Sequence, residues 1–165
     1  GFKDIGQIIR TIPSQSGKQF FSANYKLIID RKEIIISLLL DNECEREIFK
    51  SEKGIESPLK MKFDISNDLL FNNNPNIGQL DFNKLSFPLK LRKWQKGDRF
   101  KPLGMNNFKK LSDFFIDEKY SIIDKEKQWI LCSEKDIIWI VGNRIDERYK
   151  IDTKTKKVYI AKLLE

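Results

Sequence analysis

Cations are the side chains best suited to chemistry in this sequence, and they gather in one stretch. Between Lys90 and Lys110 there are eight basic residues and a single acid, Asp98. The whole net charge of +7 arises in residues 90–165, because the basic and acidic side chains of residues 1–89 balance. This asymmetry indicates a polyanionic partner, with nucleic acid the first candidate and a membrane surface the second. A merely solvated basic face is the alternative.

Several kinds of chemistry are disfavoured by what the chain lacks. It contains no histidine, and its two cysteines, Cys44 and Cys132, lie far apart in the sequence. The commonest general base and metal ligands are therefore missing, and we expect no metal site and two reduced thiols. No apolar run approaches the roughly 20 residues of a membrane span. The first residues do not resemble a secretory signal, so we expect a cytoplasmic protein without a membrane partner.

The stretch Gly97–Phe115, GDRFKPLGMNNFKKLSDFF, combines turn residues, cations and aromatic rings. A turn is predicted at its start, and Gly104 permits a positive φ. We expect a helix over Lys109–Lys119, with Lys109 and Lys110 in the first turn, where free N–H groups attract phosphate. Trp94 and Phe100 could stack on a base or ribose, with a place in the core as the alternative.

A second basic cluster lies in Gly142–Ile151. If this segment is extended, it sets Arg144, Arg148 and Lys150 on one side of the chain. Arginine suits phosphate because its planar guanidinium donates hydrogen bonds in pairs.

The elements that must position these residues are mostly strands. The fold class predicted is α+β, with mainly antiparallel strands, a few short helices and a basic, β-rich C-terminal domain. We expect a neutral region over residues 1–80, with a helix and a β-hairpin, and a basic domain over residues 81–165. The expected elements are a helix over 2–12, hairpins at 25–40 and 129–141, strands at 58–65, 86–94 and 158–164, and a loop at Asn72–Gly78. The expected core residues are Phe87, Leu89, Leu111, Phe114, Trp129 and Trp139.

The two basic clusters resemble the C-terminal domain of tRNA(Ile)-lysidine synthetase. The residues that carry the resemblance are Phe87-Pro88-Leu89, Arg92-Lys93-Trp94, Gly97-Asp98-Arg99-Phe100, Pro102-Leu103-Gly104-Met105, Lys109–Asp113, Trp139–Gly142 and Arg144–Arg148. Segments Gln15–Ser22 and Tyr25–Arg31 look like the region that precedes this domain in some members of the family.

This resemblance implies a role and a set of partners. Members of the family join lysine to the wobble cytidine of an isoleucine tRNA, using ATP. ATP and magnesium would belong to an N-terminal ATP-pyrophosphatase domain with a Ser-Gly-Gly-x-Asp-Ser loop, which this sequence does not contain. The chain would therefore be the C-terminal part of the enzyme, without catalysis or a cofactor of its own. Its partners would be the isoleucine tRNA and that catalytic domain, and a homodimer is left open.

The resemblance further implies that the chain holds the acceptor-stem side of the tRNA. Such a stem is A-form RNA, which proteins read mainly through phosphates, 2′-hydroxyls and shape. The RNA-binding residues expected are Arg92, Lys96, Arg99, Lys101, Lys109, Lys110, Arg144, Arg148 and Lys150. Asp98 and Asp113 are expected to orient these cations.

Two other functions remain as alternatives. One is a protein-interaction module that docks on the catalytic domain or on another acidic partner. The other is a magnesium-dependent nuclease that uses Asp98, Asp113 and Asp117. The lysines around these three aspartates favour ion pairing over a metal site.

Overall fold

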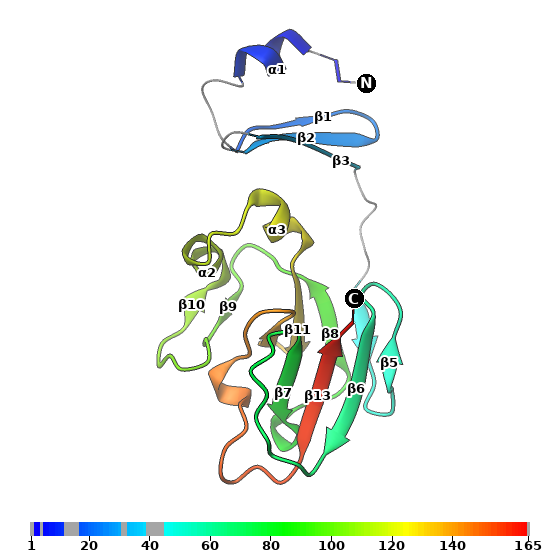
Figure 1. Cartoon of the computed structure of the whole chain (residues 1–165), viewed down its shortest axis with the longest axis vertical. Helices are drawn as coiled ribbons and strands as arrows, with labels where there is room; N and C mark the ends of the chain where they lie inside the picture. Colours follow the sequence, from blue (N-terminus) through cyan, green and yellow to red (C-terminus); the bar gives the residue numbers. More distant parts are fainter. Residues whose placement is uncertain (1, 4, 12–16, 31–32, 39–44, 165) are drawn as a thin grey trace. The chain divides into compact units, whose positions relative to one another are not determined.

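The computed structural model describes residues 2–3, 5–11, 17–30, 33–38 and 45–164, and it divides the chain into two units (Figure 1). The first unit comprises Gly1–Glu43 and Ser121–Ile123, and the second comprises Cys44–Tyr120 and Asp124–Glu165. The predicted boundary between residues 80 and 81 lies elsewhere, inside a strand of the second unit, β7 (Ile77–Asp81). The division of the structure therefore differs from the one that composition predicts.

The first unit is a small helix packed on a three-stranded sheet. Helix α1 (Ile5–Thr11) is followed by the antiparallel strands β1 (Gln19–Phe21), β2 (Tyr25–Asp30) and β3 (Glu33–Leu38), in the order β1-β2-β3. Ile8 of the helix packs with Leu27 and Ile29 of β2. The hairpin predicted at 25–40 is confirmed by the pairing of β2 with β3. The helix predicted over residues 2–12 is observed over Ile5–Thr11, and residues 4 and 12 lie outside the described part of the chain.

The second unit is a sandwich of two four-stranded antiparallel sheets, with strand orders β12-β11-β8-β4 and β5-β6-β13-β7. The bounds are β4 Arg46–Ile48, β5 Gly54–Ile55, β6 Met61–Ser66, β8 Leu89–Lys93, β11 Trp129–Ser133, β12 Asp136–Ile140 and β13 Val158–Leu163, with β7 as given above. The predicted α+β class, dominated by antiparallel strands, is confirmed.

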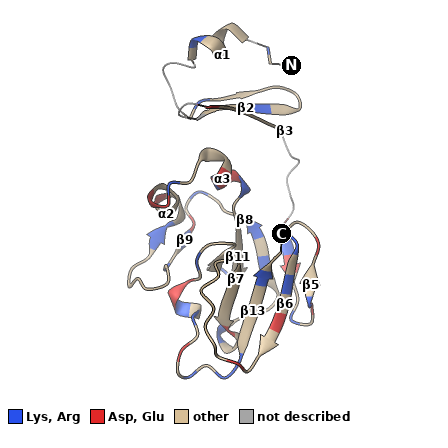
Figure 2. Cartoon of the chain, viewed as in Figure 1, with Lys and Arg blue, Asp and Glu red and all other residues tan. Residues whose placement is uncertain are grey.

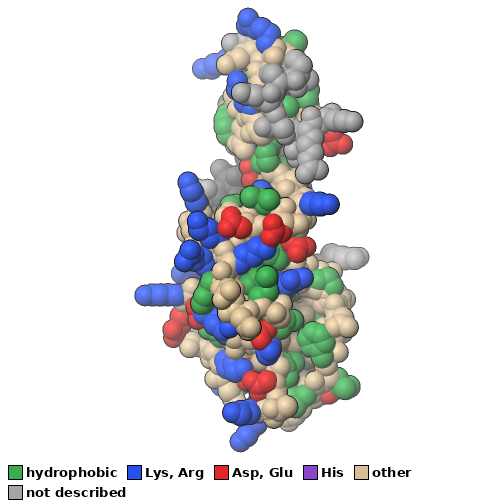
Figure 3. Space-filling model, turned by 90° about the vertical axis from the view of Figure 1, so that its left-hand side faces the viewer, with side chains coloured by type: hydrophobic (Ala, Val, Ile, Leu, Met, Phe, Trp, Pro, Cys, Tyr) green, Lys and Arg blue, Asp and Glu red, His purple; other side chains and the backbone are tan. Residues whose placement is uncertain are grey.

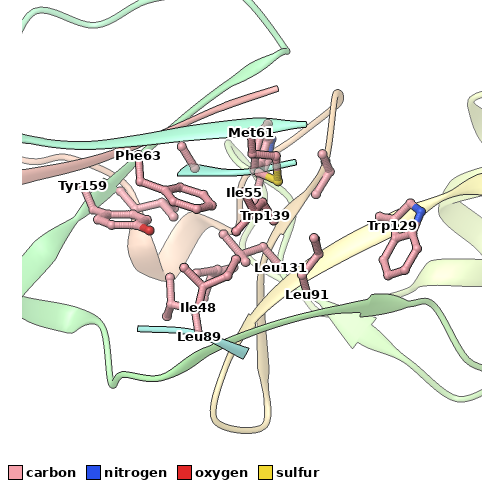
Figure 4. Close-up of a cluster of buried hydrophobic side chains, with 14 of the residues drawn as sticks. Ile48, Ile55, Met61, Phe63, Leu89, Leu91, Trp129, Leu131, Trp139 and Tyr159 are labelled. Carbon is pink, nitrogen blue, oxygen red and sulfur yellow. The ribbon is translucent and has the colours of Figure 1, made fainter. Parts of the chain in front are cut away.

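Alternating apolar residues explain why these two sheets pack together. Phe63 and Tyr159 of one sheet meet Leu89, Leu91 and Leu131 of the other in one buried cluster (Figure 4). Successive residues of a strand point to opposite faces, so the Lys and Arg residues between the leucines of β8 point away from this core. Strand β11 is buried along its whole length, which explains its unbroken apolar run.

A third layer covers the outer face of the sheet that contains β11. It consists of β9 (Arg99–Phe100), β10 (Lys109–Lys110) and α2 (Leu111–Asp117). Phe100, Leu111, Phe114 and Phe115 form its buried face and pack against Ile130 of β11. Helix α3 (Ile122–Lys127) and two 3-10 turns, Phe82–Lys84 and Glu147–Tyr149, complete the elements. In the described part of the chain, no helix is long and apolar enough to cross a membrane.

The residues predicted for the core lie where expected. Five of them, Leu89, Leu111, Phe114, Trp129 and Trp139, are buried, and Phe87 is partly buried against the core of the sandwich.

Candidate nucleic-acid interface

The two lysines of the main basic stretch belong to a two-stranded ribbon. Lys109 pairs with Phe100, and Lys110 pairs with Arg99, in an antiparallel register. The Leu111 N–H donates to the Asp98 carbonyl at 2.9 Å, and α2 begins at Leu111. The prediction that Lys109 and Lys110 form the first helical turn is therefore wrong, because strand pairing holds their backbone extended.

Alternation gives the ribbon of β9 and β10 an inner and an outer face. Phe100 is fully buried, and Lys109 opposite it is partly covered, with its ammonium 5.9 Å from the centre of the Phe114 ring. Lys109 also forms an ion pair with Asp117. Arg99 and Lys110 lie on the outer face and are exposed. The outer face is therefore the part of the ribbon that presents cations to a partner.

The two aromatic residues predicted as stacking faces are structural instead. Phe100 belongs to the core under the ribbon. Trp94 packs edge-on against Phe115, with ring centres 5.0 Å apart, and its indole N–H donates to the Lys125 carbonyl. The core alternative is therefore the correct one for both rings.

Asp98 binds Arg92 through both of its carboxylate oxygens, at 2.8 and 2.9 Å. It also accepts the backbone N–H of Gln95 at 2.7 Å, which closes the turn before β9. The hydrogen bonds to Asp98 raise the pKa of Arg92 above its ordinary value. Asp98 thus orients a cation as expected. Asp113 accepts only the Ser112 hydroxyl, at 3.3 Å, and pairs with no cation among the described residues.

The second basic cluster is organised around one buried carboxylate. Asp146 is 0% exposed and accepts hydrogen bonds from the Nε and Nη2 atoms of Arg148, both at 2.9 Å. It also accepts the backbone N–H of Lys101 at 2.8 Å. Arg148 reaches Asp136 as well, at 2.9 Å, and these carboxylates raise its pKa. Residues Glu147–Tyr149 form a 3-10 turn, so the prediction of an extended segment with three aligned cations is wrong.

Glu147 fastens the loop between β9 and β10 to the cluster formed by Asp146 and Arg148. It accepts the Gly104 N–H at 2.7 Å through one oxygen and pairs with the Lys150 ammonium through the other. Both contacts, the Gly104 amide first, lower the pKa of Glu147. Gly104 has a φ of +85°, as its type predicts. The loop is thus held at Lys101 and at Gly104 by two consecutive acidic residues.

The nine predicted cations fall into two groups. Arg92, Lys109, Arg148 and Lys150 are bound to carboxylates. The other five form no ion pair with the residues that the structure describes: Lys96, Arg99, Lys101, Lys110 and Arg144. Figure 2 shows Lys and Arg positions on the ribbon and on other strands of the second unit, and Figure 3 shows Lys and Arg side chains, with Asp and Glu among them, on the face that carries β9, β10 and α2.

Two domain families match parts of this chain. Residues 1–39 match the family described as TilS substrate binding domain, and residues 89–161 match the TilS substrate C-terminal domain. The chain belongs to the tRNA(Ile)-lysidine synthase family. The resemblance inferred from the two basic clusters is therefore confirmed.

Two relatives are similar along nearly the whole chain. It is 42% identical to the tRNA(Ile)-lysidine synthase of Parabacteroides distasonis over 161 residues, which cover 95% of the chain and 37% of that protein. It is 33% identical to the enzyme of Bacteroides thetaiotaomicron over 163 residues, which cover 97% of the chain and 36% of that protein. The chain therefore spans little more than a third of the length of these relatives.

A solved structure shares the fold. The crystal structure of a TilS C-terminal domain superposes with a TM-score of 0.60 at 18% sequence identity, covering 72% of this chain and 95% of that domain. At this identity the comparison supports the fold alone.

The nuclease alternative does not fit the contacts of two of its three aspartates. Asp98 is bound by Arg92, and Asp117 is paired with Lys109. Within the described ranges, no group of three His, Cys, Asp or Glu residues could hold a metal ion.

One exposed aromatic residue beside the site was missed. Phe108 is 57% exposed, and the Arg148 guanidinium carbon lies 4.8 Å from its ring centre. In the sequence it follows two asparagines and precedes two lysines, a pattern typical of a loop without special function. Nothing in that pattern predicts that Arg148, forty residues later, would cover one face of the ring.

Proposed function

We propose that this chain is a non-catalytic, tRNA-binding part of a tRNA(Ile)-lysidine synthase, acting in the cytoplasm. In this proposal, the basic side of the second unit holds the acceptor-stem side of an isoleucine tRNA by its phosphates. The observation that carries the proposal is a set of five cations that pair with no carboxylate of the described residues and lie on and around a ribbon whose loop is held at Lys101 and Gly104.

The contacts divide the nine cations between two roles. Arg92 fixes the turn before β9 through Asp98, and Lys109 fastens the ribbon to α2 through Asp117. Arg148 binds the buried Asp146, and Lys150 binds Glu147, which holds the loop between β9 and β10. The five cations without carboxylate partners bind phosphate. Because an unpaired cation gives up no existing ion pair on binding, its attraction to phosphate is undiminished by competition with a carboxylate. A-form RNA presents phosphates and 2′-hydroxyls to such a surface, so no base-specific contact is required.

The role in catalysis would be orientation. Holding one end of the tRNA restricts where its anticodon lies, and this lowers the entropic cost of reaching a distant active site. ATP and magnesium would be bound by the ATP-pyrophosphatase part of the enzyme, whose phosphate-binding loop this sequence does not contain.

The test is a salt titration of binding to an isoleucine tRNA, for the wild-type chain and for the double variant Arg99→Ala/Lys110→Ala. Each phosphate contact contributes about 0.7–0.9 to the slope of log K against log salt. We therefore expect a steep wild-type slope, a slope shallower by about 1.4–1.8 in the variant, and a binding free energy weaker by about 1–3 kcal/mol.

The matched control is Lys53→Ala/Lys62→Ala, which removes the same charge from exposed positions before β5 and on β6. Its binding should stay close to wild type. Equal losses in the two variants would show that only net charge matters, and binding without salt dependence would refute the proposal.

A second role, docking on protein, is favoured by the first unit. Ile34, Ile36 and Leu38 alternate along β3 and are all exposed. A row of exposed apolar side chains on a strand is typical of a surface that another protein covers. In this view the first unit contacts the catalytic domain while the second unit holds the RNA.

A further inference from the structure

A cavity of about 200 Å³ lies beside the basic ribbon, and one of its lining residues, Arg144, takes part in the function proposed above. Its wall combines the asparagine-rich loop before β7 with the turn after β12. The wall includes Phe71, Asn73, Leu103, Trp139 and Arg144. Pockets for drug-sized ligands usually measure about 300–1,000 Å³. This cavity is smaller than such pockets, so it has room for a ligand of about one planar ring system.

The loop that carries Phe71 is held in place by a buried glutamine. The Gln79 side-chain carbonyl accepts the Asn72 N–H at 2.6 Å, and its amide donates to the Leu70 carbonyl at 2.8 Å. The Asn72 side chain in turn accepts the Asn74 N–H at 2.9 Å. The backbone on both sides of Phe71 is thus held in place, and the Phe71 side chain is 59% exposed. An exposed aromatic ring at a fixed position of the backbone offers a surface on which a base can stack.

Two polar groups of the wall are available to a ligand. The Asn73 side chain is exposed and makes no hydrogen bond with the described residues. Arg144 has no carboxylate partner there, and its guanidinium carbon lies 6.0 Å from the Phe114 ring centre. Because Lys109 of β10 approaches the same ring at 5.9 Å, Arg144 lies both in the cavity wall and beside the ribbon.

We propose that this cavity binds one unpaired nucleotide that continues from the stem held by the ribbon. Its base lies against Phe71, its edge meets the Asn73 amide, and its phosphate meets Arg144. The inference rests on the proposed function. A nucleotide fits because it combines a planar face, a hydrogen-bonding edge and a negative charge, and unpaired bases are commonly stacked on aromatic rings in this way.

The experiment compares a short RNA stem with blunt ends and the same stem with a single-stranded extension at one end or the other. Affinities are measured by fluorescence anisotropy for the wild-type chain, Phe71→Ala, Asn73→Ala and Leu70→Ala. Leu70 is the matched control, because it is 77% exposed, adjoins Phe71 and does not line the cavity. In a second readout, 2-aminopurine replaces each unpaired base in turn, since its fluorescence is quenched when it stacks.

We expect the wild-type chain to bind one extended stem more tightly than the blunt stem and to quench 2-aminopurine at one position. Phe71→Ala should lose about fivefold or more in affinity for that extended stem, remove the quenching and leave blunt-stem binding unchanged. Asn73→Ala should lose affinity in the same selective way, and Leu70→Ala should match wild type.

Each other outcome overturns a specific claim. Salt-dependent binding of the blunt stem with no gain from either extension refutes the cavity site and leaves the proposed function standing. The cavity site is also refuted, with the proposed function intact, if Phe71→Ala weakens blunt and extended stems alike. If no RNA binds at all, the proposed function fails, and the cavity site fails with it.

Discussion

Arg148 and Lys110 carry the same charge in opposite surroundings. Lys110 lies exposed on the outer face of the ribbon, whereas Arg148 is bound to the buried carboxylate of Asp146 and to Asp136. Of the two, only Lys110 can exchange water for phosphate without leaving a buried charge unpaired. The surroundings of each cation, more than its type, decide its role.

Arg148→Ala should therefore destabilise the fold more than it affects direct RNA contacts. Asp146 would remain buried without a cation to balance its charge, which should lower the free energy of unfolding by about 3 kcal/mol. This value is at the lower end of the range for a broken buried ion pair because the Arg148 side chain is 29% exposed. Urea denaturation would measure this loss. Lys110→Ala is the control and should change stability by less than about 0.5 kcal/mol.

Adding Asp146→Asn to Arg148→Ala should recover part of the lost stability, because the amide leaves no buried charge. If Arg148→Ala and Lys110→Ala have equal effects on stability, Asp146 does not depend on Arg148.

The residues of the interface could be predicted from the sequence only as a group. The excess of Lys and Arg over residues 90–165 marks the basic surface correctly. The sequence does not reveal which cations are paired with carboxylates. Arg92 and Asp98 are near neighbours in the sequence, but the backbone of Lys101 and the side chain of Arg148 meet at Asp146 only because the chain folds. Phe108 and Phe71 were missed for the same reason.

At the scale of elements, local pairings were predictable and distant ones were not. The hairpins β2–β3 and β11–β12 connect neighbours in the sequence, and their apolar runs predict them. Strand β13 lies between β6 and β7, more than seventy residues earlier, and no local pattern encodes that order. The ribbon shows the same limit. The sequence pattern predicts that Lys109 and Lys110 belong to the helix that contains Leu111, but pairing with β9 keeps the backbone of both lysines extended.

The contact between β7 and β12 gives an element-scale prediction. A Cβ atom at Gly78 would lie 2.8 Å from Cδ2 of Trp139, which is buried. Gly78→Ala should therefore overpack the sandwich and lower its stability by about 1–3 kcal/mol, measured as a drop in Tm. It should also weaken binding of an extended RNA stem, because Trp139 lines the cavity.

The double variant Gly78→Ala/Trp139→Phe tests the cause. A smaller ring makes room for the new methyl group, so the double variant should lose less stability than the sum of the two single variants. Strict additivity would show that the Gly78 backbone, and not the indole, sets the cost.

At the scale of the whole molecule, the sequence predicted two parts but placed their boundary differently. The loop at Asn72–Gly78 is rich in asparagine and the charge changes soon after it, which favours a boundary there. The structure places that loop inside the second unit, because β7 pairs with β13 and completes a sheet with β6. Composition marks a change in surface charge, whereas the units are set by strand pairing over long distances.

Residues 45–165 should consequently fold and bind RNA without residues 1–44, which include the helix and the sheet of the first unit. They contain both sheets of the sandwich, the ribbon and the two buried clusters that hold them together. The TilS C-terminal domain of similar fold is itself a separate crystal structure, of which this chain covers 95%. We expect the shortened chain to melt in one cooperative transition and to keep the salt slope of the full chain for an isoleucine tRNA.

The same truncation separates the two proposed roles. If the first unit docks on the catalytic domain through β3, its removal should abolish association with that domain and leave tRNA affinity unchanged. Ile36→Lys in the full chain should have the same effect, because it places a charge in the row of exposed apolar side chains on β3. A shallower salt slope after truncation would instead mean that residues 1–43 contact RNA themselves. The phosphate-binding surface would then have to include cations of both units, and the assignment of five unpaired cations around the ribbon would be incomplete.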